Sequence, residues 1–247
     1  MKRIFPFFLA GILLLSLSAC SSETSRPDQA SSTESSTVQP PETDSDATQS
    51  SSNTMEQETV SPNSDSNILI AYFTMPEDVD TEGVDAIAGA SIVVNDGEVM
   101  GNVEYMASII QSTVGGDLFR IETVEQYPLD HDPLVDQAAQ EQDEDARPEL
   151  STHIENLEQY DTIFLGYPNW WGDMPQALYT FLEEYDFSGK TIIPFCPHGG
   201  SGFSRTESTI AELQPGAIVS ENGLTVSRND VAGSRDEVAQ WAAGFGL

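Results

Sequence analysis

The sequence predicts an α/β fold in which helices cover both faces of a parallel sheet. Three observations support this class. Continuous apolar runs such as 68–73 are typical of strands buried on both faces. Helical patterns follow these runs, the first over 103–114 with its end at Gly115-Gly116. The two kinds of segment alternate nearly throughout, as parallel strands with crossover helices require.

The remaining elements follow in the same order. Strands are expected at 117–121, 162–165, 191–195 and 217–226, the last interrupted by Asn222-Gly223. A helix with Pro175 near its first turn carries an apolar face of Leu178, Phe181, Leu182 and Tyr185. Capping-box patterns at 204–207 and 234–237 predict two more helices, with Ile210, Leu213, Val238, Trp241 and Ala242 facing inward. The acidic connection 121–162 is expected to form a solvated helix and loop.

The N-terminal part of the chain has the pattern of an exported, lipidated protein. A basic start at Lys2-Arg3 precedes an apolar run that is too short to span a bilayer comfortably. Leu17–Cys20 then resembles a bacterial lipobox, so residues 1–20 are expected to be a lipoprotein signal peptide with Cys20 as the lipidation site. Residues 21–66 contain 21 Ser or Thr among 46 positions and no aromatic residue, which predicts a disordered tether. The folded domain is then 67–247, outside the cytoplasm.

The charge of this domain excludes one class of partner. Residues 67–247 contain six Lys or Arg and 32 Asp or Glu, a net charge of about −26. A field of this sign repels nucleic acid and anionic lipid, so we expect no nucleic-acid partner and membrane contact only through the lipid anchor. Cys196 is the one Cys of the domain, so no internal disulfide is expected, and it is interpreted as a buried apolar residue.

Three loops follow the predicted strands at the sheet edge where such folds bind ligands. Residues 166–175 read GYPNWWGDMP, and either Trp170 or Trp171 suits a flat ring, with Gly172 letting the backbone approach its edge. Residues 198–202 read HGGSG, whose amides suit ring oxygens and nitrogens. Gly101-Asn102 opens the first helix, where N-terminal amides favour phosphate. A ring at two loops and a phosphate at a third indicate a mononucleotide, and FMN fits best.

With these motifs, residues 67–247 resemble the flavodoxin-like family, and most closely a bacterial lipoprotein branch with GYPxWWGxxP and HGGSG. The resemblance also takes in Tyr127-Pro128, 147–150 and 180–190. It implies a five-stranded parallel sheet of order 2-1-3-4-5 and non-covalent FMN. The cofactor-binding residues that it implies are Thr74, Gly101, Asn102, Val103, Pro168, Asn169, Trp170, Trp171, Gly172, His198, Gly199, Gly200, Ser201 and Gly202.

The sequence departs from the family at the phosphate loop. The family runs Ser/Thr-x-Thr-Gly-Asn-Thr straight into the helix, whereas here Thr74 is separated from Gly101-Asn102 by the insertion 75–100. A β-hairpin is expected in this insertion, with strands at 91–94 and 98–100 joined at 95–97. Val103 replaces a hydroxyl residue, so the backbone amides of 102–104 are left for the phosphate and a lower affinity is expected. The hairpin is in a position to cover the site.

Three functions stay open. An FMN-binding electron carrier with an unknown redox partner, protein or small molecule, is preferred. The alternatives are an FMN-dependent NAD(P)H oxidoreductase acting on quinone-like acceptors, and a flavodoxin-fold binding module that has lost the flavin. One indole could also only seal the sheet, and His198 could only cap a strand. A metal at His131, a calcium loop at 78–89 and a hydrolase nucleophile at Ser201 are not favoured, because their ligand or motif patterns are incomplete.

Overall fold

The computed structural model describes residues 67–247, so the predicted signal peptide, Cys20 and tether lie outside the described residues. The main sheet is parallel, in the order β5-β1-β6-β7-β8, with β9 also paired to β7. Its strands are β1 (Ile68–Tyr72), β5 (Asp117–Arg120), β6 (Thr162–Gly166), β7 (Thr191–His198), β8 (Ile218–Val219) and β9 (Leu224–Ser227). Because β8 and β9 pair with successive parts of β7, they form one interrupted fifth strand. The predicted order and the interruption at Asn222-Gly223 are confirmed.

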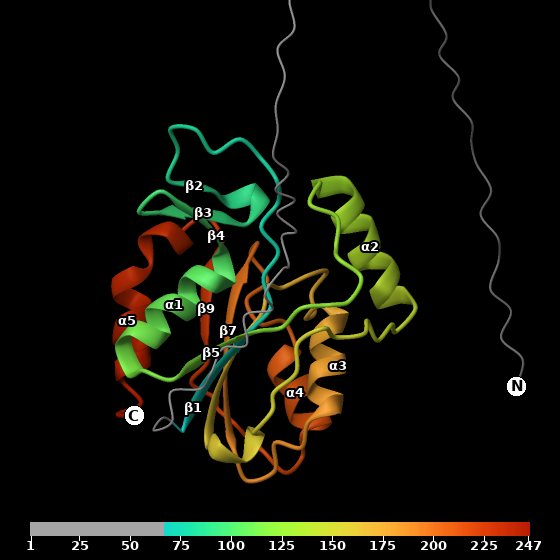
Figure 1. Ribbon diagram of the computed structural model, residues 1–247, viewed down its shortest axis with the longest axis vertical. Helices are drawn as coiled ribbons and strands as arrows, with labels where there is room; N and C mark the ends of the chain where they lie inside the picture. Colours follow the sequence, from blue (N-terminus) through green and yellow to red (C-terminus); the bar gives the residue numbers. More distant parts are fainter. Residues whose placement is uncertain (1–66) are drawn as a thin grey trace, which may run out of the picture. The chain divides into compact units, whose positions relative to one another are not determined.

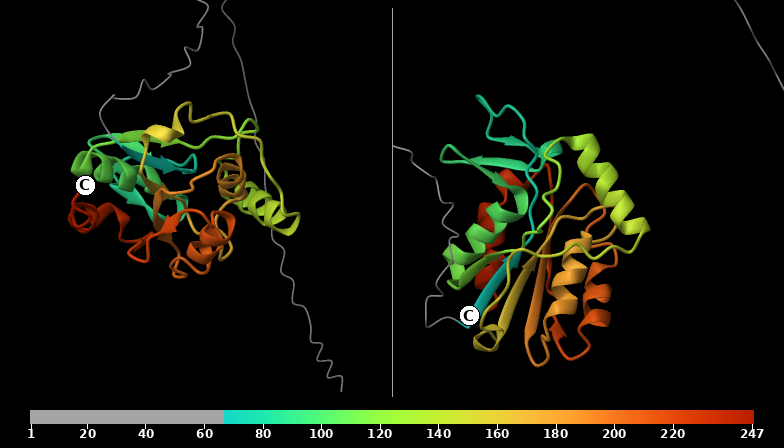
Figure 2. Two further views of the ribbon diagram at one scale, coloured as in Figure 1. Left: turned by 90° about the horizontal axis from the view of Figure 1, so that it is seen from below. Right: turned by 45° about the vertical axis from the view of Figure 1, so that its right-hand side comes forward.

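Helices cover both faces of this sheet, as the alternation of elements predicts (Figures 1 and 2). On one face lie α1 (Asn102–Val114) and α5 (Arg235–Ala243), and on the other α3 (Gln176–Glu184) and α4 (Thr206–Leu213). Each face has its own apolar core. Alternate residues of β1 enter opposite cores: Leu69 joins Phe181 on the α3 side, and Ile70 joins Ile110 on the α1 side. Burial on both faces explains why these strands are continuously apolar.

The insertion after β1 forms a second, antiparallel sheet beside the start of α1 (Figure 1). The expected hairpin is present as β3 (Ile92–Asn95) and β4 (Glu98–Gly101), with Asp96-Gly97 at its turn. A third strand, β2 (Ala86–Ile87), and a 3-10 turn, η1 (Ala88–Ala90), were not expected from the sequence. Since β4 runs directly into α1, the insertion fixes where the helix begins.

The connection between β5 and β6 contains one further helix, α2 (His131–Asp143), and a 3-10 turn, η2 (Leu157–Gln159). This confirms the expected helix and loop. The helix lies at the α3 side, near the carboxyl ends of the strands (Figure 2). Within 67–247, no helix has the length and apolar character needed to cross a membrane.

Both helices predicted from capping-box patterns are present, but neither has the predicted serine side-chain cap. α4 begins at Thr206 after Arg205, and Ser204 lies before them with φ 57°, so its side chain does not cap the helix. Ser234 does precede α5, but its hydroxyl donates to the Val231 carbonyl at 2.8 Å in the 3-10 turn η3 (Val231–Gly233). In both cases the serine hydroxyl makes another hydrogen bond: Ser204 accepts from the Asn169 side chain of the loop after β6, and Ser234 donates within its own turn.

Candidate functional site

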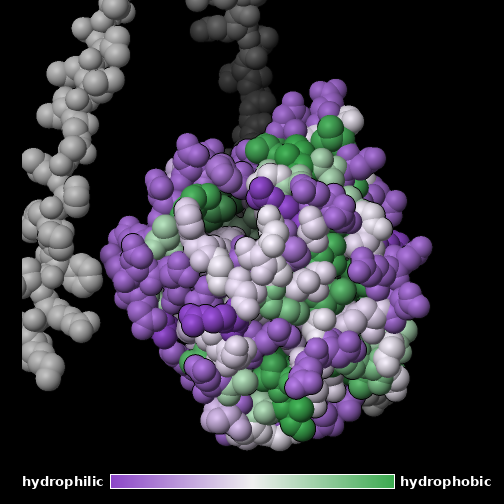
Figure 3. Space-filling view, turned by 180° about the vertical axis from the view of Figure 1, so that it is seen from behind, coloured by the Kyte–Doolittle hydropathy of each residue, from purple (hydrophilic) through white to green (hydrophobic). Residues whose placement is uncertain are grey.

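A cavity of about 210 Å³ opens at the carboxyl edge of the main sheet. Figure 3 shows the hollow between the hydrophilic surface of α2 and the inserted sheet. It is lined from seven segments: the loop after β1, the insertion, the start of α1, α2, the loop after β6, the end of β7 and the residue after β9. This is the edge at which parallel sheets bind ligands.

The structure brings nine of the fourteen predicted residues into the cavity wall. They are Thr74, Asn102, Val103, Pro168, Asn169, Trp170, Trp171, His198 and Gly199. The other five are neighbours of the wall and do not line it: Gly101, Gly172, Gly200, Ser201 and Gly202.

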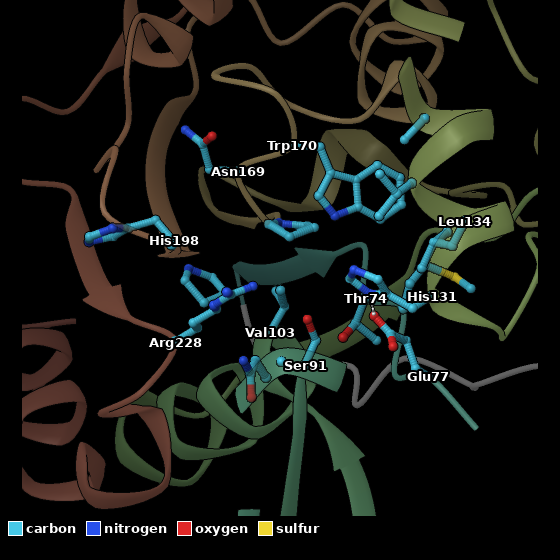
Figure 4. Close-up of a pocket in the computed structure, with 18 of the residues that line it drawn as sticks. Thr74, Glu77, Ser91, Val103, His131, Leu134, Asn169, Trp170, His198 and Arg228 are labelled. Atoms are coloured by element: carbon cyan, nitrogen blue, oxygen red, sulfur yellow. Dashed lines mark hydrogen bonds and ion pairs between the residues drawn. The ribbon is translucent and has the colours of Figure 1, made fainter. Parts of the chain in front are cut away.

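The two tryptophans have different surroundings. Trp170 packs edge-on against Phe73 and Tyr127, with ring centroids 5.6 and 5.7 Å apart, and this fixes its indole at the cavity wall (Figure 4). Trp171 is 60% exposed, and its indole nitrogen donates to the Val135 carbonyl of α2 at 3.3 Å. Trp170 therefore packs on the core and also forms part of the cavity wall, while Trp171 lines the cavity where it opens to solvent.

A tight turn explains this difference. The backbones of Trp170 and Asp173 exchange two hydrogen bonds, at 2.8 and 2.9 Å, so that Trp171 and Gly172 form the tip of a two-residue turn. Both tip residues have positive φ, 52° for Trp171 and 81° for Gly172. Such a turn needs residues that tolerate the left-handed region, which glycine does without strain.

Asn169 connects this loop to the HGGSG loop. Its side-chain amide donates to the Gly202 carbonyl at 3.0 Å and to the Ser204 hydroxyl at 2.9 Å. Its side-chain oxygen accepts a hydrogen bond from the Gly172 backbone nitrogen at 3.1 Å. Gly172 and Gly202 thus help to hold the wall in place without lining it.

His198 ends β7 beside the cavity. Its Nδ1 accepts a hydrogen bond from the Gly200 backbone nitrogen at 2.9 Å, so the ring orders the first turn of the HGGSG loop. In Figure 4 the imidazole points away from the centre of the cavity. His198 therefore makes the capping contact that was one of the two interpretations of its sequence position. It also lines the cavity.

The start of α1 is closely packed against Thr74. A Cβ added to Gly101 would overlap the Thr74 hydroxyl, and Thr74 is only 3% exposed. Only glycine allows the backbone of 101 to come this near.

The insertion changes the amides of this helix start. The Asn102 backbone nitrogen donates to the Ser91 carbonyl at 2.8 Å, and the Gly101 nitrogen lies 3.3 Å from the Glu104 carboxylate. The expectation that all amides of 102–104 are free for phosphate is thus wrong at Asn102. The amides of Val103 and Glu104 remain, because the first turn of a helix offers them no carbonyl acceptor.

α2 supplies a wall that the sequence motifs did not predict. Leu134, Val135 and Ala138 line the cavity on its apolar side. At the helix start, His131 Nδ1 lies 2.7 Å from the Glu77 carboxylate, and this hydrogen bond raises the pKa of the imidazole. Among the described residues, no group of three or more His, Cys, Asp or Glu side chains is placed to hold a metal ion.

The other lining residues missed from the sequence come from the insertion and the ends of strands: Met75, Glu77, Gly89, Ser91, Pro197 and Arg228. None belongs to a recognisable motif. The sequence offers one indication for Arg228. Basic residues are scarce in the domain, which has six, and Arg228 directly follows a strand, where ligand-binding residues are expected.

Cys196 is fully buried, and burial raises the pKa of its thiol, as expected for an apolar residue rather than a nucleophile.

Comparisons with known proteins identify the family of the chain. A model of the flavodoxin family matches residues 92–244. A flavodoxin from Picosynechococcus sp. is 28% identical over 141 residues, which are 56% of this chain and 69% of that protein. The crystal structure of a protein from Bacteroides uniformis, provisionally described as a flavoprotein, is 26% identical with a TM-score of 0.53, over 72% of this chain and 97% of the other. A flavoprotein from Lactobacillus acidophilus, crystallised with FMN, is 20% identical with a TM-score of 0.45, over 68% of this chain and 97% of the other.

Proposed function

We propose that this chain, which belongs to the flavodoxin family, binds FMN and transfers electrons at the outer face of a bacterial membrane. One observation carries the proposal. The cavity at the carboxyl edge of the sheet joins an aromatic wall at Trp170 to the start of α1, and these are the two features that a flavin mononucleotide requires.

The residues present fit this cofactor. Pro168, Trp170 and Trp171 offer apolar surface for a planar ring, and the amides of Val103 and Glu104 with Arg228 offer donors and charge for a phosphate. Asn102 lines the same end, and its side-chain oxygen is buried without a hydrogen-bond partner among the described residues. A bound ligand would supply what this oxygen lacks.

The chain itself would bind, orient and tune the cofactor, while bound FMN would supply the redox chemistry. The contacts of Trp170 to Phe73 and Tyr127 preorganise one wall before any ligand enters. Asn169 holds the turn at Gly172 against the HGGSG loop, so two walls keep a fixed separation. The 32 acidic residues of the domain disfavour added negative charge, and we expect a low reduction potential.

The visible absorption spectrum tests the proposal. Protein containing residues 21–247 should purify yellow or take up added FMN, and heat release should yield FMN by mass spectrometry. A colourless protein that takes up no flavin would contradict it and would favour a binding module.

The location and partners are part of the same proposal. The lipobox at 17–20 supports an anchor at Cys20, and the Ser/Thr-rich segment 21–66 supports a tether that holds the domain away from the membrane. The electron partner is then a protein or a small molecule outside the cytoplasm. Cys20→Ala should move the protein from the membrane fraction to the soluble fraction, and the same distribution in both forms would contradict the anchor.

A second candidate is an FMN-dependent oxidoreductase that takes hydride from NAD(P)H and reduces a quinone-like acceptor. The apolar side chains of Leu134, Val135 and Ala138 lie beside the aromatic loop and favour it, because they extend the apolar surface available to a second planar molecule (Figure 4). Steady-state oxidation of NADH or NADPH, with and without a soluble quinone, separates this activity from a pure carrier.

A further inference from the structure

Three side chains line the inner end of the cavity, on the side of the start of α1. Ser91 reaches it from the insertion, Val103 from the first turn of the helix, and Arg228 from the residue after β9 (Figure 4). These segments are far apart in the sequence, and the guanidinium of Arg228 points into the cavity above Val103.

The helix start alone is a weakened anion site. Its Gly101 amide is directed to the Glu104 carboxylate, and its Asn102 amide is bonded to the Ser91 carbonyl. Val103 brings no hydroxyl, and the carboxylate of Glu104 adds negative charge to the same turn. Two of the four amides that a helix normally offers are therefore engaged.

Arg228 is suited to make up this deficit. Four of the six basic residues in 67–247 have side-chain partners: Arg120 and Arg147 form ion pairs, Lys190 donates to the Tyr160 carbonyl, and Arg235 packs over Tyr105. Of the other two, Arg205 does not line the cavity, whereas Arg228 does. Within the described residues, its guanidinium has no ion pair although the domain carries 32 acidic residues.

The position of Arg228 is fixed by its backbone. Its amide donates to the His198 carbonyl at 2.8 Å, which attaches it to the end of β7. Its Nε then passes Gly199, 3.8 Å from where a Cβ of that residue would lie. The side chain is therefore directed along the cavity rather than into the acidic surface.

Asn102 gives an independent sign of a missing ligand. The residue is 3% exposed and lines the cavity, and its side-chain oxygen has no partner. A buried amide with an unmade hydrogen bond calls for an explanation, and a ligand hydroxyl or a water on a ligand at this end provides one.

We propose that Arg228, assisted by the Ser91 hydroxyl, binds the phosphate of FMN and replaces the hydroxyl residues that the interrupted loop lacks. The inference rests on the proposed function, since it takes FMN as the ligand. Through Ser91, the insertion would then take part in binding the phosphate and would not only cover the site. It also predicts that the phosphate, and not only the ring, contributes strongly to affinity, because guanidinium–phosphate contacts are charge-assisted and bidentate.

Titration with FMN and with riboflavin, which lacks the phosphate, tests this. Arg228→Gln should weaken FMN binding about 10- to 100-fold and leave riboflavin binding within about twofold. Arg228→Lys should fall between, since a lysine keeps the charge and loses the fork. Arg205→Gln is the matched control, and it should change neither affinity.

A second variant addresses the insertion. Ser91 has φ 57°, so Ser91→Gly removes the hydroxyl, suits the backbone, and keeps the carbonyl bonded to Asn102. It should weaken FMN binding about two- to tenfold without affecting riboflavin. Thermal melts of each variant confirm that the fold is retained.

The outcomes separate the two proposals. If the wild type binds FMN and riboflavin equally, or if Arg228→Gln weakens both alike or neither, the phosphate role of Arg228 is wrong while flavin binding stands. If the wild type binds neither flavin, the proposed function is wrong and this inference falls with it.

Discussion

At one end of the cavity, Trp170 is held by ring contacts to Phe73 and Tyr127, whereas at the other end β4 runs directly into α1 and the Asn102 amide donates to the Ser91 carbonyl. The loop of the aromatic end is one contiguous motif, 166–175, although its indole packs on residues of other segments. The phosphate end is assembled from segments separated by the insertion and by most of the domain. The first therefore carries a local sequence motif, whereas the second depends on how distant segments pair.

This difference has a consequence for energetics. Substitutions at the aromatic end should change stability together with ligand binding, because its walls belong to the core. Substitutions of exposed side chains at the phosphate end should change ligand binding with little cost in stability.

The largest effect is expected from Trp170→Ala. The change removes an indole that packs on Phe73 and Tyr127, and it should lower the free energy of unfolding by about 2–4 kcal/mol, somewhat less than for a fully buried tryptophan. FMN binding should be lost as well. Chemical denaturation and flavin titration measure the two effects.

Trp171→Ala is the matched control for this change. The indole of Trp171 is 60% exposed, so stability should change by less than about 0.5 kcal/mol. Equal destabilisation by the two variants would show that the aromatic end is not organised around Trp170.

The aromatic end was also the part that sequence could predict. The strand, the turn and the helix of 162–184 are contiguous, so local patterns suffice for them. The place of Arg228 was not predictable, because it depends on how β9 pairs with β7. The bond between Asn102 and Ser91 likewise depends on the path of the insertion. The predicted N-cap at Ser204 is wrong for a related reason. The loop gives Ser204 a φ of 57°, and its hydroxyl accepts a hydrogen bond from Asn169 instead of capping α4.

Gly101→Ala tests the packing beneath the phosphate end. The new Cβ would overlap the Thr74 hydroxyl, which is buried, so we expect a loss of about 1–3 kcal/mol in stability. Gly233→Ala is the control, because nothing lies within 4 Å of its added Cβ. Thr74→Ala combined with Gly101→Ala should recover part of the loss, and a strictly additive double mutant would refute the overlap as its cause.

Asn169→Ala tests the connection between the two ring-side loops. It removes hydrogen bonds to Gly202, Ser204 and Gly172, and we expect a loss of about 1–2 kcal/mol. Hydrogen exchange should rise at Gly172, whose amide loses its acceptor. Unchanged exchange there would indicate that the turn is stable without Asn169.

The smallest effect is expected where the phosphate end meets α2, at the pair of His131 and Glu77. The hydrogen bond that His131 donates to the Glu77 carboxylate raises the pKa of the imidazole, with further contributions from Asp132, which raises it, and Arg228, which lowers it. Because the pKa is higher in the folded state, the pair stabilises the protein fully below pH about 6.5, and this contribution is lost as pH rises through the folded pKa. His131 is more than half exposed, which keeps the effect small.

Glu77→Gln should return the His131 pKa toward its ordinary value, as measured by NMR titration of the imidazole, with His131→Asn to assign the signal. The pH dependence of stability between pH 6 and 8 should become shallower in the same variant. Since the carboxylate of Glu77 is 9% exposed and lines the cavity, the variant should also remove negative charge near the inner end. FMN binding should then strengthen slightly if a phosphate lies there, and an affinity lowered by Glu77→Gln would place the phosphate elsewhere.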